Sequence, residues 1–274
     1  MTVAVTYLQA PWQPRLEVLS LPASGRTARP PILMVHGAYT HGGSWRHTFM
    51  PWFAGRGHDV HAVSLRGHGG SDGHPMLDAW GLDHYGEDVR RALAMIGQPA
   101  IVFGSSMGGL VLQRLLSEGP AIRAMVLVSS VPPTGLFDSV SRMTFDRPRQ
   151  MGQLLQLAIA GRSGRGMLEL LAHDPLPMTD ETAASHMLTR ESSRALWEMT
   201  WAPMPWSART AAAVPMLAVH GEYDRMIPAS AVQAIARQFQ AMPLLVPEVG
   251  HVPMIERRWE SVAQSIADWL ERQR

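Results

Sequence analysis

The chain has 274 residues, of which 46% are hydrophobic and 17% charged, and its formal net charge is +1. This composition is typical of a globular protein with a sizeable core, and the near-neutral charge provides no attraction for nucleic acid or an anionic membrane. Because the chain contains neither cysteine nor lysine, disulfides, thiolate nucleophiles, Cys-bound zinc and Schiff-base catalysis are excluded.

Short apolar runs alternate with segments of helical period along most of the chain. An antiparallel hairpin at one edge of a sheet is predicted from 3–8 and 15–20. The other apolar runs are continuously hydrophobic, which is typical of parallel strands covered on both faces; they occupy 31–35, 60–63, 100–103, 125–128, 216–219 and 244–246. Helical period is found at 82–97, 107–117, 229–240 and 256–272. The alternation predicts an open α/β sheet with right-handed crossovers.

One pattern stands out at the end of a predicted strand, where residues 101–112 read IVFGSSMGGLVL. The pattern G-x-S-x-G places a nucleophile on a tight strand-to-helix turn, where side chains at the flanking positions would collide with their neighbours. Ser106 has glycine two residues before and after it, whereas the residue two before Ser105 is a phenylalanine. A second match, GGSDG at 69–73, is followed by His-Pro, which we expect to prevent a helix from starting directly after Ser71, where an elbow requires one. Ser106 is therefore the candidate nucleophile.

The alternation of strands and helices stops between residues 132 and 210. Helical period is visible there only in short patches at 148–160, 165–172, 180–190 and 191–201, followed by a Pro-rich exit. We expect a helical cap, or lid, at 132–210, lying over a core domain formed by 1–131 and 211–274. The cap is rich in flexible Met and in Trp side chains, which favour an adaptable apolar pocket. Most of these side chains should nevertheless pack between the cap and the sheet. The Met and Trp residues of the cap are Met143, Met151, Met167, Met178, Met187, Met199, Met204, Trp197, Trp201 and Trp206.

Four further motifs accompany GSSMGG in a fixed order. They are HGAYTHGGSW from residue 36, LRGHGGSDG from residue 65, HGEYDRMIP from residue 220 and VGHVPMIE from residue 249. With them the chain resembles the α/β-hydrolase superfamily over nearly its whole length, and in particular its serine esterase and lysophospholipase-like members. The resemblance implies an α/β-hydrolase fold, with a mostly parallel eight-stranded sheet, flanking helices and a helical cap insertion.

The resemblance also implies a complete catalytic set. A serine hydroxyl needs a base to take its proton, and the base needs a carboxylate to orient it. The family order Ser…acid…His implies His251 as the base and Asp224 as the acid, with Glu222 as a weaker candidate. The family's oxyanion hole would take backbone N–H groups from Met107 and Ala38.

Several activities found on this fold conflict with the sequence. Epoxide- and halide-directed relatives carry Asp where this chain has Ser106, and hydroxynitrile lyases of the HGA…W type recruit a lysine, which is absent. An intact serine elbow also disfavours the cofactor-free dioxygenases. We expect hydrolysis of a carboxylic ester, thioester or lactone of a small hydrophobic molecule. One alternative is a carbon–carbon bond hydrolase of the meta-cleavage-product type. The elbow of those enzymes usually reads G-N-S-M-G-G, and this chain has Ser105 in place of the Asn. Another is a ligand-binding protein without turnover.

No metal or organic cofactor is expected, because the scattered histidines lack ligand spacing. No apolar run reaches the roughly 18–20 residues of a spanning helix, and the N-terminal sequence lacks the pattern of a secretory signal. We therefore expect a cytoplasmic monomer or homodimer without stable membrane insertion.

Overall fold

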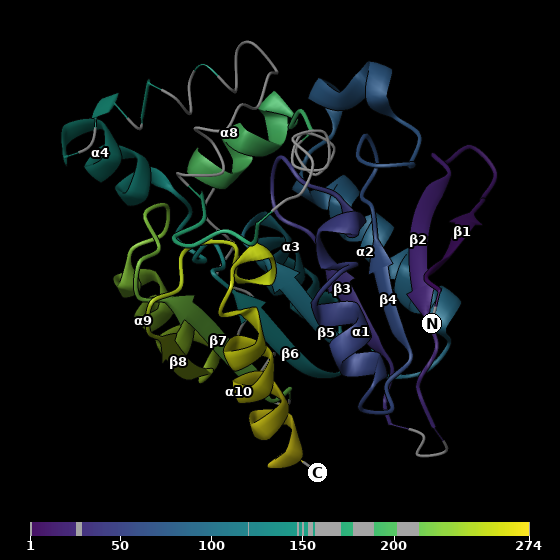
Figure 1. Cartoon of the computed structure of the whole chain (residues 1–274). Coiled ribbons are helices and arrows are strands. Elements are labelled where there is room, and N and C mark those ends of the chain that lie inside the picture. The colour runs from purple at the N-terminus through teal and green to yellow at the C-terminus, as the bar shows by residue number, and fades with distance from the viewer. Residues whose placement is uncertain are drawn as a thin grey trace.

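The computed structural model describes residues 2–25, 29–119, 121–146, 148–149, 151–152, 156, 171–177, 189–201 and 214–273. Within these ranges the chain forms one eight-stranded sheet with helices packed on both faces (Figure 1). The strands are β1 (Ala4–Leu8), β2 (Leu16–Leu21), β3 (Ile32–Val35), β4 (Val60–Val63), β5 (Ala100–Ser105), β6 (Ile122–Val128), β7 (Met216–Gly221) and β8 (Met242–Val246).

The sheet is parallel except at one edge. Its order is β1-β2-β4-β3-β5-β6-β7-β8. β1 and β2 form an antiparallel hairpin, and β2 also runs antiparallel to β4. All other neighbours are parallel, with Met34 opposite Phe103 and Val126 opposite Leu217. The predicted edge hairpin and the predicted parallel strands are therefore confirmed, as is the α/β-hydrolase fold class.

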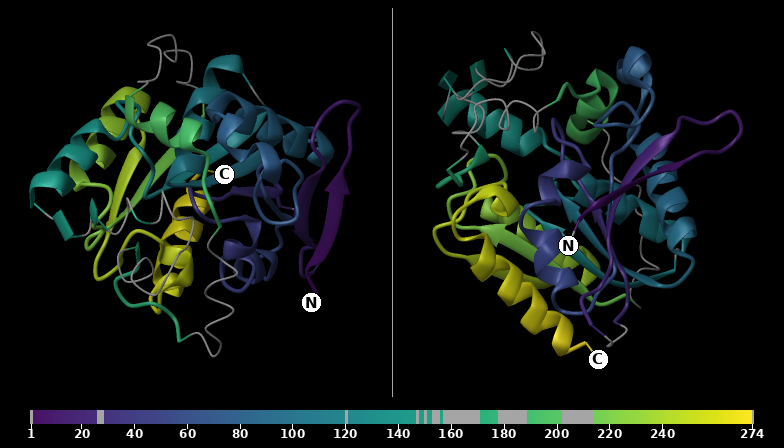
Figure 2. Two further views of the ribbon diagram at one scale, coloured as in Figure 1. Left: turned by 90° about the horizontal axis from the view of Figure 1, so that it is seen from above. Right: turned by 45° about the vertical axis from the view of Figure 1, so that its right-hand side comes forward.

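Alternate residues of the central strands face two separate hydrophobic clusters, as the twofold side-chain period of a strand requires. Leu33 and Val35 lie in the first cluster, which is covered by α2 (Leu82–Ile96), α3 (Met107–Leu115) and α9 (Ala229–Phe239). Ile32 and Met34 lie in the second, which is covered by α1 (Phe49–Ala54) and α10 (Trp259–Glu271). Figure 2 shows these two helical layers from further directions. The core therefore has helices on both sides of the sheet.

Part of the predicted cap is described. Its patch at 191–201 forms α8 (Ser193–Trp201), and α4 (Phe137–Asp146) precedes it; both helices lie above the sheet in Figure 1. Most of the patches at 148–160, 165–172 and 180–190 lie outside the described residues, so the cap boundaries stay a prediction.

The Met and Trp side chains of the cap fall into two groups. Met143 and Met199 are buried, which agrees with packing, whereas Trp197 and Trp201 are more than half exposed. Met151 is half-buried, and the others lie outside the described residues: Met167, Met178, Met187, Met204 and Trp206.

The structure adds short helices that the sequence patterns did not predict. They include α1, α4 and 3₁₀ turns at Gly42–Trp45 and His74–Ala79. No helix begins directly after Ser71, as expected from the His-Pro pair, and the 3₁₀ turn starts only at His74. Pro75 lies in the first turn, where its missing N–H removes no intrahelical hydrogen bond.

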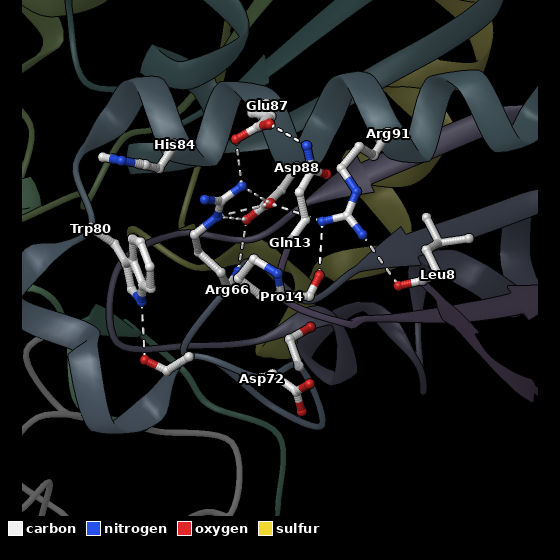
Figure 3. Close-up of polar contacts among 12 residues, drawn as sticks. Leu8, Gln13, Pro14, Arg66, Asp72, Trp80, His84, Glu87, Asp88 and Arg91 are labelled. Carbon is white, nitrogen blue, oxygen red and sulfur yellow. Dashed lines mark hydrogen bonds and ion pairs between the residues drawn. The ribbon is translucent and has the colours of Figure 1, made fainter. Parts of the chain in front are cut away.

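A buried ion pair fixes the loop after β4, which carries the LRGHGGSDG motif. The Arg66 guanidinium donates to both oxygens of Asp88 at 2.7–3.1 Å and to Glu87 at 2.8 Å, and both acids belong to α2 (Figure 3). The Arg66 backbone N–H donates to Asp88 as well, at 2.8 Å. Because the Arg66–Asp88 pair is buried and multiply bonded, breaking it from one side would leave an uncompensated charge.

Candidate active site

Ser106 lies on a strained turn between β5 and α3. Its φ of 49° and ψ of −112° are unusual for a residue with a side chain. A Cβ on Gly104 would lie 2.7 Å from the Gly108 carbonyl oxygen, and one on Gly108 would lie 2.5 Å from the His36 carbonyl oxygen. The chain can make this turn only because both positions are glycine, which is the physical content of the G-x-S-x-G pattern.

The structure brings Ser106, His251 and Asp224 into one hydrogen-bonded series, although 145 residues separate the first two in the chain. His251 Nε2 lies 3.0 Å from Ser106 Oγ, and His251 Nδ1 lies 2.8 Å from Asp224 Oδ2. His251 follows β8 and precedes α10, Asp224 follows β7, and Ser106 follows β5. Loops at the carboxyl ends of three parallel strands thus supply the three side chains.

The environment of Asp224 favours its ionised form. Its carboxylate is fully buried, and Oδ1 accepts the backbone N–H groups of Met226 at 2.8 Å and Ile227 at 2.9 Å. Burial alone would raise the pKa of Asp224, but His251, His220 and the Ile227 N–H hold that pKa below its ordinary value. An ionised Asp224 only accepts hydrogen bonds, so His251 Nδ1 carries a proton toward it, and the other ring nitrogen, Nε2, faces Ser106 Oγ.

Glu256, which the sequence analysis did not identify, holds the loop that carries His251. Its buried carboxylate accepts the backbone N–H of Gly250 at 2.9 Å, and burial raises the pKa of this group despite its donors. The His251 N–H donates to the carbonyl oxygen of Leu171 at 2.8 Å. The His251 loop therefore has hydrogen-bond partners on both the core and the segment 171–177. The only signal in the sequence was that Glu256 lies within the VGHVPMIE motif.

The loop after β3 passes directly against the elbow. A Cβ on Gly37 would lie 3.1 Å from the Ser106 Cβ, so the chain approaches the candidate nucleophile as closely as a glycine permits. Leu65 N–H donates to His36 Nε2 at 3.0 Å, so His36 Nδ1 carries the proton and donates to the Gly37 carbonyl oxygen at 2.9 Å. His36 thereby holds the turn that precedes Ala38. Met107 is the first residue of α3, a position whose N–H has no partner within a helix.

The other candidate residues lie elsewhere. Ser71, from the second G-x-S-x-G match, accepts the Glu17 N–H at 2.8 Å and donates to the Ser64 carbonyl oxygen at 2.6 Å, so it holds its loop. Glu222 is exposed and accepts the Glu248 N–H at 3.2 Å. Neither side chain is bonded to the Ser106–His251–Asp224 series.

Across the described ranges, no three His, Asp or Glu side chains converge as a metal-binding set. No helix in the same part of the chain combines the length and the apolarity needed to cross a bilayer.

Comparison with known proteins agrees with this architecture. Residues 32–265 match the model of the alpha/beta hydrolase family. A monoacylglycerol lipase of Mycolicibacterium smegmatis is 26% identical over 87% of either chain. A pimeloyl-[acyl-carrier protein] methyl ester esterase of Xanthomonas campestris is 28% identical over 89% of this chain and 94% of its own. The solved structure of a 2-hydroxy-6-oxo-6-phenylhexa-2,4-dienoate hydrolase from Rhodococcus sp. strain RHA1 superposes with a TM-score of 0.71 at 19% identity, covering 98% of this chain and 100% of the other. The relatives identified from sequence are thus hydrolases of esters, and the chain belongs to the alpha/beta hydrolase family.

Proposed function

We propose that the protein is a serine hydrolase that cleaves a carboxylic ester, thioester or lactone of a small hydrophobic molecule through an acyl-enzyme. The observation that carries this proposal is the hydrogen-bonded series from Ser106 Oγ through His251 to the buried carboxylate of Asp224. The buried Asp224 carboxylate beside Nδ1 supports a base role for Nε2, which faces the Ser106 hydroxyl.

The proposed reaction has two halves. In the first, His251 Nε2 takes the Ser106 proton while Oγ attacks the substrate carbonyl carbon, and the imidazolium returns that proton to the departing alcohol or thiol. In the second, a water loses its proton to His251 and attacks the acyl carbonyl. The bond to Oγ then breaks and the imidazolium gives its proton to Oγ, which releases the acid and restores Ser106. Asp224 stays ionised and stabilises the imidazolium in both halves.

The negative charge that develops on the carbonyl oxygen needs fixed donors. We propose the backbone N–H groups of Met107 and Ala38, because Met107 begins α3 beside Ser106 and Ala38 follows the Gly37 contact with the elbow. One such donor is worth about 10²–10³ in kcat in enzymes where it has been removed.

The ester class is supported by the names of the two relatives identified from sequence, an acylglycerol lipase and a methyl ester esterase. We infer a hydrophobic substrate from the Met- and Trp-rich sequence of the proposed cap. Two observations support the carbon–carbon hydrolase alternative. The elbow of this chain shares Ser-Met-Gly-Gly with that class, and one solved structure of the same fold is such a hydrolase.

The test uses Ser106→Ala, with Ser71→Ala as the matched control from the second motif match. We expect wild type and Ser71→Ala to hydrolyse p-nitrophenyl esters and to bind one equivalent of a fluorophosphonate, measured by intact mass. Ser106→Ala should lose labelling and at least about 10³-fold in kcat.

The same assays separate the alternatives. Rapid turnover of a dienoate ring-fission product with feeble ester turnover would assign the carbon–carbon hydrolase instead. If the folded wild type shows neither labelling nor turnover, the remaining alternative is a ligand-binding protein without catalytic activity. A series of acyl chain lengths then defines the pocket.

A further inference from the structure

Glu191, a further buried carboxylate, belongs to the proposed cap and contacts the loop beside the elbow. Its side chain is fully buried, and it accepts four hydrogen bonds in the structure. Oε1 receives the Tyr85 hydroxyl at 2.9 Å and the Ser192 N–H at 2.7 Å. Oε2 receives the Tyr39 N–H at 3.3 Å and lies 3.2 Å from His68 Nε2. One carboxylate therefore joins α2, the loops after β3 and β4, and the start of α8.

The partners of His68 favour a charged ring opposite Glu191. His68 Nδ1 lies 3.1 Å from the Arg66 carbonyl oxygen, which can only accept, and Nε2 faces the carboxylate. Both ring nitrogens therefore need a proton. Burial alone would lower the pKa of His68, but Glu191 and the backbone acceptors raise it above its ordinary value. The result is a fully buried His68–Glu191 ion pair.

The loop that Glu191 contacts contains a residue in an unfavourable conformation. Gly37 to Thr40 form a turn in which Thr40 N–H donates to the Gly37 carbonyl oxygen at 3.4 Å, and Tyr39, its third residue, has a φ of 63°. Turns with this feature normally place glycine or asparagine there. A bulky residue stays in this region only when its surroundings hold it.

The residues that hold Tyr39 come from the segment before α8. The Tyr39 N–H donates to Glu191, and its carbonyl oxygen accepts the Thr189 N–H at 2.7 Å. Both backbone groups of Tyr39 are thus fixed by residues 189–191. The peptide group that donates to Glu191 joins Tyr39 to Ala38, the proposed oxyanion donor.

We propose that Glu191 is a positioning residue, which fixes the Ala38–Tyr39 peptide and so aims the Ala38 N–H at the oxygen of the acyl intermediate. The proposal rests on the proposed esterase function. It predicts that loss of Glu191 impairs the transition state more than substrate binding, because the oxyanion exists only after attack.

The test compares Glu191→Gln with Glu198→Gln in the p-nitrophenyl ester assay. Glu198 is a matched control, since it also joins α8 to the core, through the Leu82 N–H at 2.7 Å, without contacting the turn at 37–40. We expect Glu191→Gln to lower kcat about 10- to 100-fold with KM changed less than about twofold. Glu198→Gln should keep kcat within about twofold of wild type. Thermal unfolding verifies that each variant is folded.

Two further variants keep the proposal testable if Glu191→Gln does not fold. Glu191→Asp retains the charge opposite His68 but shortens the reach to Tyr39, and should also lower kcat at constant KM. Tyr39→Gly adopts a positive φ without strain. If Glu191 acts through residue 39, either substitution of Glu191 should lower kcat by a smaller factor in the Tyr39→Gly background than in wild type.

Equal kcat values for wild type and the folded Glu191 variants would overturn the proposal. So would a Glu191 substitution that lowers kcat by the same factor in the Tyr39→Gly background as in wild type. These outcomes differ from failure of the proposed function, in which the wild type itself neither hydrolyses esters nor reacts with a fluorophosphonate at Ser106.

Discussion

His36 and His68 lie side by side, with ring centroids 5.0 Å apart. Their hydrogen bonds favour opposite protonation states. His36 has one donor and one acceptor as partners, which suits a neutral ring, whereas His68 has two acceptors, which suits a charged one. Burial, the neighbouring His68 charge and His41 hold the pKa of His36 well below its ordinary value. A neutral ring beside a charged one keeps like charges apart at the base of the loop.

This arrangement predicts a specific dependence of stability on pH. Because the folded pKa of His36 is lowered, the unfolded chain binds its proton first as the pH falls below about 6.5. The free energy of unfolding contributed by neutral His36 is therefore present above about pH 6.5 and is lost as the pH falls toward the folded pKa, by ~1.4 kcal/mol for each unit of depression. The measurement is urea unfolding at a series of pH values between about 7 and 5.

The variant that tests this is His36→Gln, which keeps an acceptor for Leu65 and cannot titrate. It should be less stable than wild type at pH 7, by about 1 kcal/mol, but should lose less stability on acidification. The raised pKa of His68 makes its contribution to the free energy of unfolding largest below about pH 6.5, and this contribution is lost as the pH rises through the folded-state pKa. His68→Gln should therefore lose most stability relative to wild type at low pH. Equal pH slopes for His36→Gln and wild type would contradict the assignment.

At the scale of elements, two glycines let α3 approach the sheet closely. Gly108 and Gly109 lie in its first turn, and a Cβ on Gly109 would lie 2.2 Å from Ser130 Oγ and 2.6 Å from Ser130 Cβ. Ser130 Oγ also accepts the Gln113 side-chain N–H at 2.9 Å, so it has little freedom to move. The first turn of α3, next to Ser106, therefore packs closely against the residues that follow β6.

Two alanine substitutions in helices should therefore have opposite effects. Gly109→Ala should lower the free energy of unfolding by about 1–3 kcal/mol, because the added methyl group overpacks the contact with Ser130. Gly86→Ala, in the middle of α2, meets no atom within 4 Å and should raise it by about 0.5–1 kcal/mol through helix propensity. Urea unfolding of both variants checks this; a stabilised Gly109→Ala would show that the contact is loose.

The same elements show what sequence patterns can and cannot predict. The central strands were predictable because burial on both faces requires continuous apolar runs such as Ile101 to Phe103. The helix α1 was not, because its six residues FMPWFA are too few to display a helical period and include a proline. Glu191 and Glu256 escaped for a different reason. The partners of Glu191 come from distant parts of the chain, such as the Tyr39 N–H 152 residues away, so no local pattern records them. Glu256 bonds a backbone N–H, which any residue type provides, so the identity of Gly250 gave no sign of the contact.

At the scale of the whole molecule, the first and last parts of the chain form one core. β6 pairs with β7, so the sheet continues across the segment between them. Thr48 Oγ1 donates to the Met254 carbonyl oxygen at 2.7 Å, and Trp52 packs edge-on against Trp259 at 5.7 Å. Figure 1 shows α1 and α10 on the same side of the sheet. Ser106 and His251 belong to opposite sides of this division, so the candidate site exists only when the two parts are joined.

We therefore expect residues 2–119 and 214–273 to unfold together. Tryptophan fluorescence, which reports on buried Trp45 and Trp269, and far-UV circular dichroism should give coincident urea transitions with one midpoint. Peptides from β5 and from α10 should share the same dependence of amide hydrogen exchange on urea, because neither part buries its apolar face without the other. Loss of protection in α10 at lower urea than in β5, with β5 still protected, would show instead that the C-terminal part is a separate cooperative unit. In that case the Ser106–His251 contact would break before the sheet unfolds, and ester hydrolysis would disappear at lower urea than the fluorescence change.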